Sequence, residues 1–193
     1  MSGPDFPPVP SAEPAPHTAP NGTAQDMAAV TALSPAQRVF LMLQGPHGPF
    51  FDRAARLLRD TGAQVWRVGF NAGDEFFWTD RAHFIRHTGT PEEWPAHLDR
   101  IIAEKGVTDI VLYGDVRPIH AAARRAAARD GLVLHVFEEG YLRPFWITYE
   151  RGGSNGHSAL MQIGLDDMRK ALRTRIGEPN RPPARWGDRK SVV

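Results

Sequence analysis

The stretch "TDIVLYGDVRPIHAAARRAAARDGLVLHVFEEG", residues 108–140, contains the alternation that decides the fold class. It begins with a β-branched apolar run at 108–115, continues through an Ala-rich amphipathic segment at 117–131 and ends with a second apolar run at 132–140. Gly131 closes the amphipathic segment, as glycine commonly does at the end of a helix. A strand, a helix and a second strand in this order are typical of a parallel sheet covered by helices.

The same alternation extends toward the N-terminus. Strand-length apolar runs at 38–45 and 63–71 alternate with helical patterns at 49–62 and 93–106, and a polar and aromatic loop is expected at 72–93. Continuous apolar runs suit strands that are buried on both faces of a sheet. We therefore expect an α/β fold, a doubly wound parallel sheet with helices on both faces.

The two ends of the chain differ from this middle part. Residues 1–36 are crowded with Pro, Ala, Ser and Thr, and such a composition cannot bury enough apolar surface to offset the entropy of ordering. We expect a disordered tail there, one folded domain over 37–178 with a last amphipathic helix at 165–177, and a second disordered, Arg- and Pro-rich tail at 179–193.

Composition excludes several classes of function. The chain has no Cys, so disulfides, thiol catalysis and Cys-ligated metals are ruled out. The histidines lack metal-ligand spacing, and we expect no metal and no cofactor. A net charge of +1 gives no general attraction to nucleic acid. No run approaches the ~20 apolar residues of a membrane span, so we expect a protein that is soluble or at most peripheral, and the lack of Cys fits a cytoplasmic setting.

Polar or glycine-containing segments follow each expected strand at its carboxyl end, where open parallel sheets bind ligands. They are "QGPHGPF" (44–50), "NAGDEFFW" (71–78), "GDVRP" (114–118) and "EEGYLRP" (138–144). Each has a structural and a functional interpretation. The first is a tight glycine turn or an anion site at a helix N-terminus, with His47 as a proton donor or acceptor or a contact for a sugar hydroxyl.

The second and third segments leave similar alternatives open. Asn71 and Asp74 beside three aromatic rings form either a platform for a sugar or an ordinary hydrophobic anchor below a loop. Asp115 and Arg117 form either a structural ion pair or a clamp on a charged ligand.

Two adjacent acids distinguish the fourth segment. In a period-two strand, Glu138 and Glu139 point to opposite faces, so only one of them can face a given site. That one could serve as a general base or as a nucleophile. Gly140 allows close approach of backbone or ligand, and Arg143 supplies an anion contact.

These segments in this order resemble the KpsS/LipB-type capsule polysaccharide proteins of Gram-negative bacteria. The resemblance rests on "VFLMLQGPHGPFF", "VWRVGFNAGDEFFW", "LYGDVRPIHAAARRAA" and, most specifically, "VFEEGYLRPFWITYERGGSNGHS". It covers roughly residues 38–160 and implies a Rossmann-like sheet similar to the N-terminal, acceptor-side half of a GT-B glycosyltransferase.

The resemblance implies a β-Kdo transferase that moves Kdo from CMP-Kdo to a phosphatidylglycerol-type lipid or Kdo-lipid acceptor. Related KpsC-type enzymes carry an acidic-Asp-Gly-aromatic corner where this chain has Glu138-Glu139-Gly140-Tyr141, so Glu139 inherits the role of nucleophile or base. This chain has Glu at that position instead of Asp, and the Glu side chain is one methylene longer. The expected substrate-binding residues are His47, Asn71, Asp74, Asp115, Arg117, Arg143 and Asn155.

Family members usually have about twice this folded length, and their C-terminal half supplies the nucleotide-sugar site. We therefore expect an acceptor-side lobe that is inactive alone and uses CMP-Kdo only when a C-terminal half is supplied. The expected partners are capsule biosynthesis and export proteins and the inner-membrane surface, with no nucleic acid. The alternatives are a non-catalytic glycolipid-binding or scaffold component of the export machinery, and a fragment that barely folds.

Overall fold

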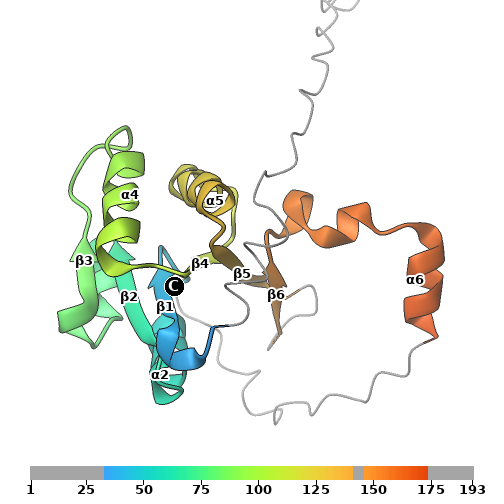
Figure 1. Cartoon of the computed structure of the whole chain (residues 1–193), viewed down its shortest axis with the longest axis horizontal. Coiled ribbons are helices and arrows are strands. Elements are labelled where there is room, and N and C mark those ends of the chain that lie inside the picture. Colours follow the sequence, from blue (N-terminus) through green and yellow to red (C-terminus); the bar gives the residue numbers. More distant parts are fainter. Residues whose placement is uncertain (1–32, 141–145, 174–193) are drawn as a thin grey trace, which may run out of the picture.

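The computed structural model describes residues 33–140 and 146–173, which form an α/β domain around one six-stranded sheet (Figure 1). The strand order is β3-β2-β1-β4-β5-β6, and every neighbouring pair is parallel except β5 and β6. The predicted fold class is confirmed. The strands are β1 (Val39–Met42), β2 (Gln64–Gly69), β3 (Phe84–Arg86), β4 (Asp109–Tyr113), β5 (Val133–Glu139) and β6 (Ile147–Arg151).

Helices cover both faces of the sheet, as the continuous apolar strands require. On one face α2 (Phe50–Asp60) buries Phe51 and Ala55 against β1 and β2. On the other face α4 (Trp94–Lys105) and α5 (Pro118–Asp130) lie side by side and enclose the larger core (Figure 1). Because every parallel connection runs through a helix, the carboxyl ends of β1, β2, β4 and β5 meet along one edge.

Two strands were not predicted from the sequence. β3 has three residues and β6 has five half-buried or exposed ones, so neither shows a long apolar run. Both lie at the edges of the sheet, where a strand gains its hydrogen bonds from one neighbour and needs little apolar surface. β6 runs antiparallel to β5, so the predicted parallel sheet carries one antiparallel edge strand.

The segment expected as a loop at 72–93 has structure of its own. It contains the short helix α3 (Ala72–Phe76), the 3₁₀ turn η2 (Arg81–His83) and strand β3. α3 begins at Asn71, whose side-chain Oδ1 accepts a hydrogen bond of 3.0 Å from the backbone N–H of Asp74. This capping interaction is the reason why the polar residues form a helical turn here.

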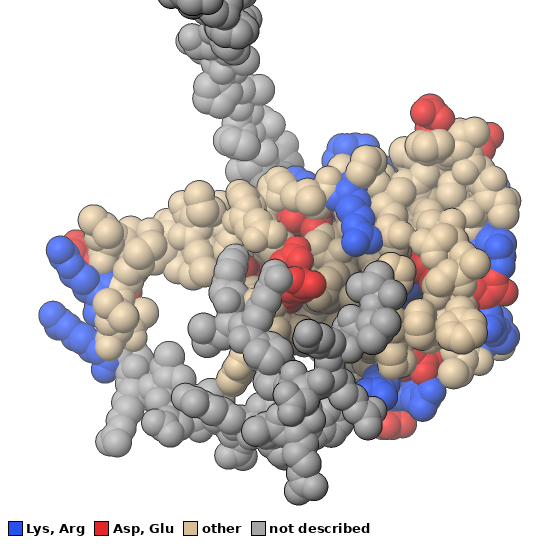
Figure 2. All heavy atoms as spheres, turned by 180° about the vertical axis from the view of Figure 1, so that it is seen from behind, with Lys and Arg blue, Asp and Glu red and all other residues tan. Residues whose placement is uncertain are grey.

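The outer parts of the described chain carry shorter elements. The 3₁₀ turn η1 (Pro35–Gln37) lies across the predicted start of the domain at residue 37. After β6, the turns η3 (Asn155–His157) and η4 (Ala159–Gln162) lead to α6 (Leu165–Leu172), which extends away from the sheet (Figure 1). No residue of α6 is buried, and basic side chains cluster at its outer end (Figure 2).

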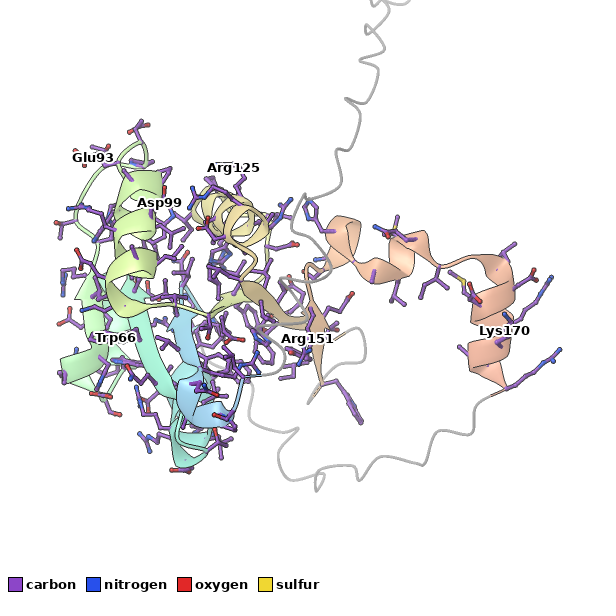
Figure 3. All side chains as sticks on the ribbon, in the orientation of Figure 1. Trp66, Glu93, Asp99, Arg125, Arg151 and Lys170 are labelled. Atoms are coloured by element: carbon purple, nitrogen blue, oxygen red, sulfur yellow. The ribbon has the colours of Figure 1, made fainter. Side chains whose placement is uncertain are left out.

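A shallow groove lies between α4 and α5, away from the carboxyl edge of the sheet. It has a volume of about 320 Å³, and Asp99 and Arg125 lie beside it on the two helices (Figure 3). Arg129 closes it with an ion pair of 3.0 Å to Asp99. Along residues 33–140 and 146–173, no helix combines the length and the apolar character needed to traverse a bilayer.

Candidate functional site

A cleft of about 550 Å³ lies at the carboxyl ends of β1, β2, β4 and β5, on the face covered by α2. Strand order reverses between β1 and β4, and this is the position where doubly wound sheets bind ligands. Five of the predicted site residues line it: His47, Asn71, Asp74, Arg117 and Glu139. The other lining residues are Gln44, Gly45, Pro46, Gly48, Phe51, Asp52, Arg67, Gly73, Phe77, Trp78 and Tyr113.

The turn between β1 and α2 forms one wall of the cleft. A Cβ on Gly45 would lie 2.7 Å from the ring of Phe51, so glycine is needed for the ring to pack below the turn. Gly48 has a φ of 108°, a conformation that favours glycine. His47 lies exposed between these two glycines on the cleft wall.

A buried ion pair forms the floor of the cleft. Arg67 of β2 is 4% exposed, and its Nη2 donates a hydrogen bond of 2.7 Å to Oδ1 of Asp74. The other carboxylate oxygen of Asp74 accepts from the backbone N–H of Phe70 at 3.0 Å. Asp74 therefore lines the cleft with a carboxylate whose two oxygens both have internal partners.

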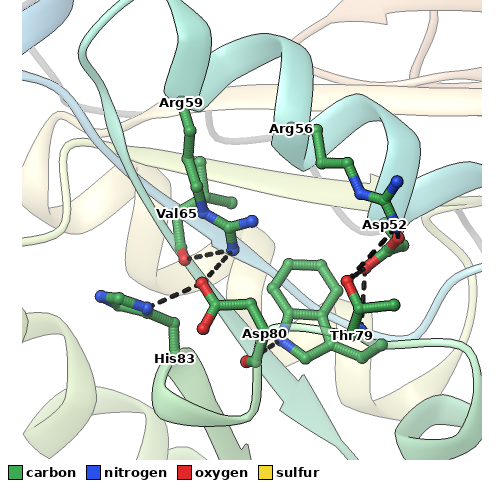
Figure 4. A network of polar contacts seen from close by, with 8 residues as sticks. Asp52, Arg56, Arg59, Val65, Thr79, Asp80 and His83 are labelled. Carbon is green, nitrogen blue, oxygen red and sulfur yellow. Dashed lines mark hydrogen bonds and ion pairs between the residues drawn. The ribbon is translucent and has the colours of Figure 1, made fainter.

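The aromatic segment after α3 is fixed to α2 through Asp52. One oxygen of this buried carboxylate accepts from the backbone N–H and the hydroxyl of Thr79, and the other accepts from Arg56 (Figure 4). Burial opposes ionisation of Asp52, but the bonds from Thr79 and Arg56 outweigh it and lower its pKa. The neighbouring Asp80 binds Arg59 and His83 (Figure 4), and this places the buried Trp78 at the cleft.

The two adjacent acids of β5 lie on opposite faces of the sheet, as period two requires. Glu139 is exposed and lines the cleft on the α2 face. Glu138 points to the other face, where its Oε2 lies 3.4 Å from Nδ2 of Asn155. A Cβ on Gly140 would overlap the backbone of Trp146, so glycine allows the chain that enters β6 to pass close to this corner.

Asp115 and Asn155 do not line the cleft. Asp115 is fully buried and accepts hydrogen bonds from the backbone N–H of Ser154 at 3.0 Å, from its hydroxyl at 3.3 Å and from Nδ1 of His157 at 3.0 Å. Asn155 has a φ of 51° in the same turn. Arg143 lies outside the described residues.

The Asp115–His157 pair was not foreseen, because its two members are separated by 42 positions in the chain. The sequence signal for Arg67 was stronger. In the alternating run "VWRVG" a charged residue occupies the same strand face as buried Val65. Among the described residues, no group of three or more His, Asp and Glu side chains is arranged to hold a metal ion.

The Asp115 contact predicts the tautomer of His157. Because an ionised carboxylate can only accept, Nδ1 must carry the proton, and Nε2 of the neutral ring is left as an acceptor. We expect ¹⁵N-resolved NMR of the neutral ring to show a protonated Nδ1 and an unprotonated Nε2. Asp115→Ala, which removes the acceptor, should abolish this preference, whereas Ser154→Ala, which removes only one donor to Asp115, should keep it. A proton on Nε2 in the unmodified protein would contradict the assignment.

Comparison with known proteins agrees with the position of these polar segments. A family model described as "Capsule polysaccharide biosynthesis protein" matches residues 108–163, the part of the chain that supplies Arg117, Glu139 and the Asp115 network. The capsule polysaccharide export protein KpsS of Escherichia coli is 41% identical over 121 residues, which are 63% of this chain and 31% of that protein. Over these 121 residues the chain is similar to proteins of the KpsS/LipB type.

A second relative leads to the same assignment. The capsule polysaccharide modification protein LipB of Neisseria meningitidis serogroup A is 39% identical over 121 residues, covering 62% of this chain and 29% of LipB. The matched part of this chain thus spans about a third of the length of these relatives.

Among solved structures, an S-adenosyl-L-methionine methyltransferase from Silicibacter pomeroyi is similar to this chain. It is 16% identical with a TM-score of 0.33, and the match covers 69% of this chain and 83% of that one. At this TM-score the match carries no weight, and the fold class rests on the sheet itself.

Proposed function

We propose that this KpsS/LipB-type domain is the acceptor-side lobe of a β-Kdo transferase in capsule polysaccharide biosynthesis. The complete enzyme would move Kdo from CMP-Kdo to a phosphatidylglycerol-type lipid or a Kdo-lipid. The observation that carries the proposal is the position of Glu139 in the cleft at the carboxyl end of β5. Five of the residues expected from the sequence line this same cleft, which supports one ligand site rather than separate surface features.

Glu139 has two possible roles in this proposal. As a nucleophile, its carboxylate oxygen attacks the anomeric carbon of Kdo and CMP leaves with the electron pair of the broken bond. The acceptor hydroxyl then attacks that carbon, the carboxylate leaves, and the hydroxyl proton passes to a base. As a general base, Glu139 takes the proton of the acceptor hydroxyl while that oxygen bonds to the anomeric carbon of Kdo and CMP leaves with the electron pair of the broken bond.

The test is Kdo transfer by a full-length KpsS/LipB-type protein that carries the substitution equivalent to Glu139→Gln. We expect kcat to fall by about a hundredfold or more, because the amide can neither attack the sugar nor accept the proton. The matched control is Glu138→Gln, which changes the adjacent acid on the opposite face of the strand. Full activity of the Glu139 variant, measured as Kdo-lipid product by mass spectrometry, would remove the assigned role.

A non-catalytic function is the second candidate, because one relative is named as an export protein and the match spans only about a third of its length. In that case the cleft binds a lipid-linked glycan without transferring a sugar. Binding of glycolipid by this chain, together with no transfer even when the remaining part of a relative is added, would favour this candidate.

A further inference from the structure

Arg67 on the floor of the cleft has more hydrogen-bond donors than the described residues accept. Only its Nη2 has a partner, the carboxylate of Asp74. The Arg67 side chain is 95% buried, and its Nε has no acceptor within residues 33–140 and 146–173. A buried donor that lacks an acceptor costs about 1–3 kcal/mol, so the described residues satisfy this guanidinium only in part.

Aromatic rings fix the position of this guanidinium. It lies 5.0 Å from the ring centroid of Phe51 and 6.0 Å from that of Trp78, and both residues line the cleft. Burial lowers the pKa of Arg67 although Asp74 raises it. The guanidinium is thus held at the floor of the cleft by one carboxylate and two aromatic rings.

Two further sources of positive potential face the same cleft. α2 is eleven residues long, and the residue that precedes it at the N-cap position, Pro49, provides no side-chain cap. The first backbone N–H groups of such a helix are without intrahelical partners and favour an anion. Arg117 lies exposed at the rim, where no acceptor for its guanidinium occurs among the described side chains and backbone.

The two buried acids of the cleft are engaged by groups of the protein itself, and Asp74 is the counter-ion of Arg67. Both oxygens of Asp52 and both oxygens of Asp74 already accept hydrogen bonds from protein donors. Glu139 lies on the β5 side of the cleft, at the opposite end of the strand row from β2. The cleft therefore combines a carboxylate from β5 with a set of donors on β2 and α2.

We propose that the floor of this cleft is an oxyanion subsite, in which Arg67, Arg117 and the N-terminal turn of α2 bind a carboxylate or phosphate group of the ligand. A planar guanidinium suits such groups because two of its N–H donors can bind two oxygens at once. The subsite fixes the acidic group of a sugar or headgroup and so leaves its hydroxyls to reach Glu139. The identity of the ligand rests on the proposed function, whereas anion binding does not.

The experiment measures binding of small probes to the complete 193-residue chain by calorimetry and by NMR. The probes are glucuronate, glucose 6-phosphate and inorganic phosphate, with glucose as the neutral control. We expect at least about tenfold tighter binding of an anionic sugar than of glucose, and a shift of the Arg67 Nε–H signal on saturation. Preference for glucuronate or for glucose 6-phosphate identifies which acidic group the subsite takes.

Two variants test the residues. Arg67→Met combined with Asp74→Asn removes the buried pair without leaving a lone charge, and should lower affinity for the anionic sugar at least about tenfold. Arg117→Gln, at the exposed rim, should lower it about threefold and tests the subsite even if the double variant does not fold. Arg53→Gln changes an exposed Arg of α2 outside the cleft and should have no effect.

Equal affinity for glucose and both anionic sugars would overturn the subsite. An unshifted Arg67 signal at saturation would overturn it as well. These binding measurements do not depend on sugar transfer. Tighter binding of the anionic sugars would therefore support the subsite even if the proposed enzymatic role were rejected. If a full-length relative transferred Kdo but this chain bound none of the anionic probes, the subsite would be rejected and the proposed function would remain.

Discussion

Asp109→Ala is expected to destabilise the domain by about 3–5 kcal/mol, because it removes one partner of a buried charge network. Asp109 is fully buried at the start of β4. Its Oδ1 accepts from Nη2 of Arg38 at 2.8 Å and lies 2.7 Å from Nε2 of His135. Its Oδ2 accepts from Nε of Arg38 at 3.1 Å and from the hydroxyl of Thr108 at 2.6 Å.

The cost is large because the network joins four strands. Arg38 precedes β1, His135 belongs to β5, and Nδ1 of His135 lies 2.7 Å from the hydroxyl of Tyr149 on β6. Removing the carboxylate leaves the Arg38 guanidinium, whose side chain is 17% exposed, without its anion. Denaturant unfolding followed by circular dichroism measures the free energy of unfolding directly.

Asp99→Ala is the matched control. Asp99 also pairs with an arginine, Arg129, but both side chains are about half exposed. Exposed pairs of this kind contribute about 0–1 kcal/mol. Similar losses of unfolding free energy in the two variants would contradict the importance of the buried network.

The second large effect is a loss of stability in mild acid through His120. This side chain of α5 is fully buried, and its Nδ1 lies 2.6 Å from the carbonyl oxygen of Gly114. Burial lowers its pKa from 6.5 to about 4, although the contact with Gly114 acts in the opposite direction. Its Nε2 is buried without a partner in the described part of the chain, so a proton there would be poorly stabilised.

The direction of the pH effect follows from this shift. Between pH 6.5 and about 4 the unfolded chain binds a proton at His120 that the folded protein does not bind. The free energy of unfolding therefore falls as the pH is lowered through this window, by about 3 kcal/mol in total. Asp52 contributes to the pH dependence of stability only at lower pH, because its pKa lies below its ordinary value of 3.8.

His120→Asn separates this contribution from the general effect of acid. The Asn amide can donate to the carbonyl of Gly114 in place of Nδ1 but does not titrate. We expect the unfolding free energy of the variant to depend less steeply on pH between 7 and 4 than that of the unmodified protein. His47→Asn, at an exposed position, should leave the slope unchanged. Equal slopes for all three proteins would refute the assignment to His120.

The α/β class, and the edge of the sheet at which the polar segments meet, could be predicted from the periodicity of the sequence. The apolar runs at 38–45, 63–71, 108–115 and 132–140 contain β1, β2, β4 and β5, because strands covered on both faces must be apolar along their length. In a parallel sheet the residues after each strand converge, and for this reason His47, Asn71, Arg117 and Glu139 line one cleft.

Only the tertiary structure decided the partners of the buried polar groups. Arg67 lies on the cleft floor, and Asp115 is held by Ser154 and His157 away from the cleft. The edge strands β3 and β6 likewise depend on their neighbours for hydrogen bonds. Local periodicity fixes which face of an element a side chain occupies, but a charge is compensated by groups that are distant in sequence and become adjacent only when the sheet has formed.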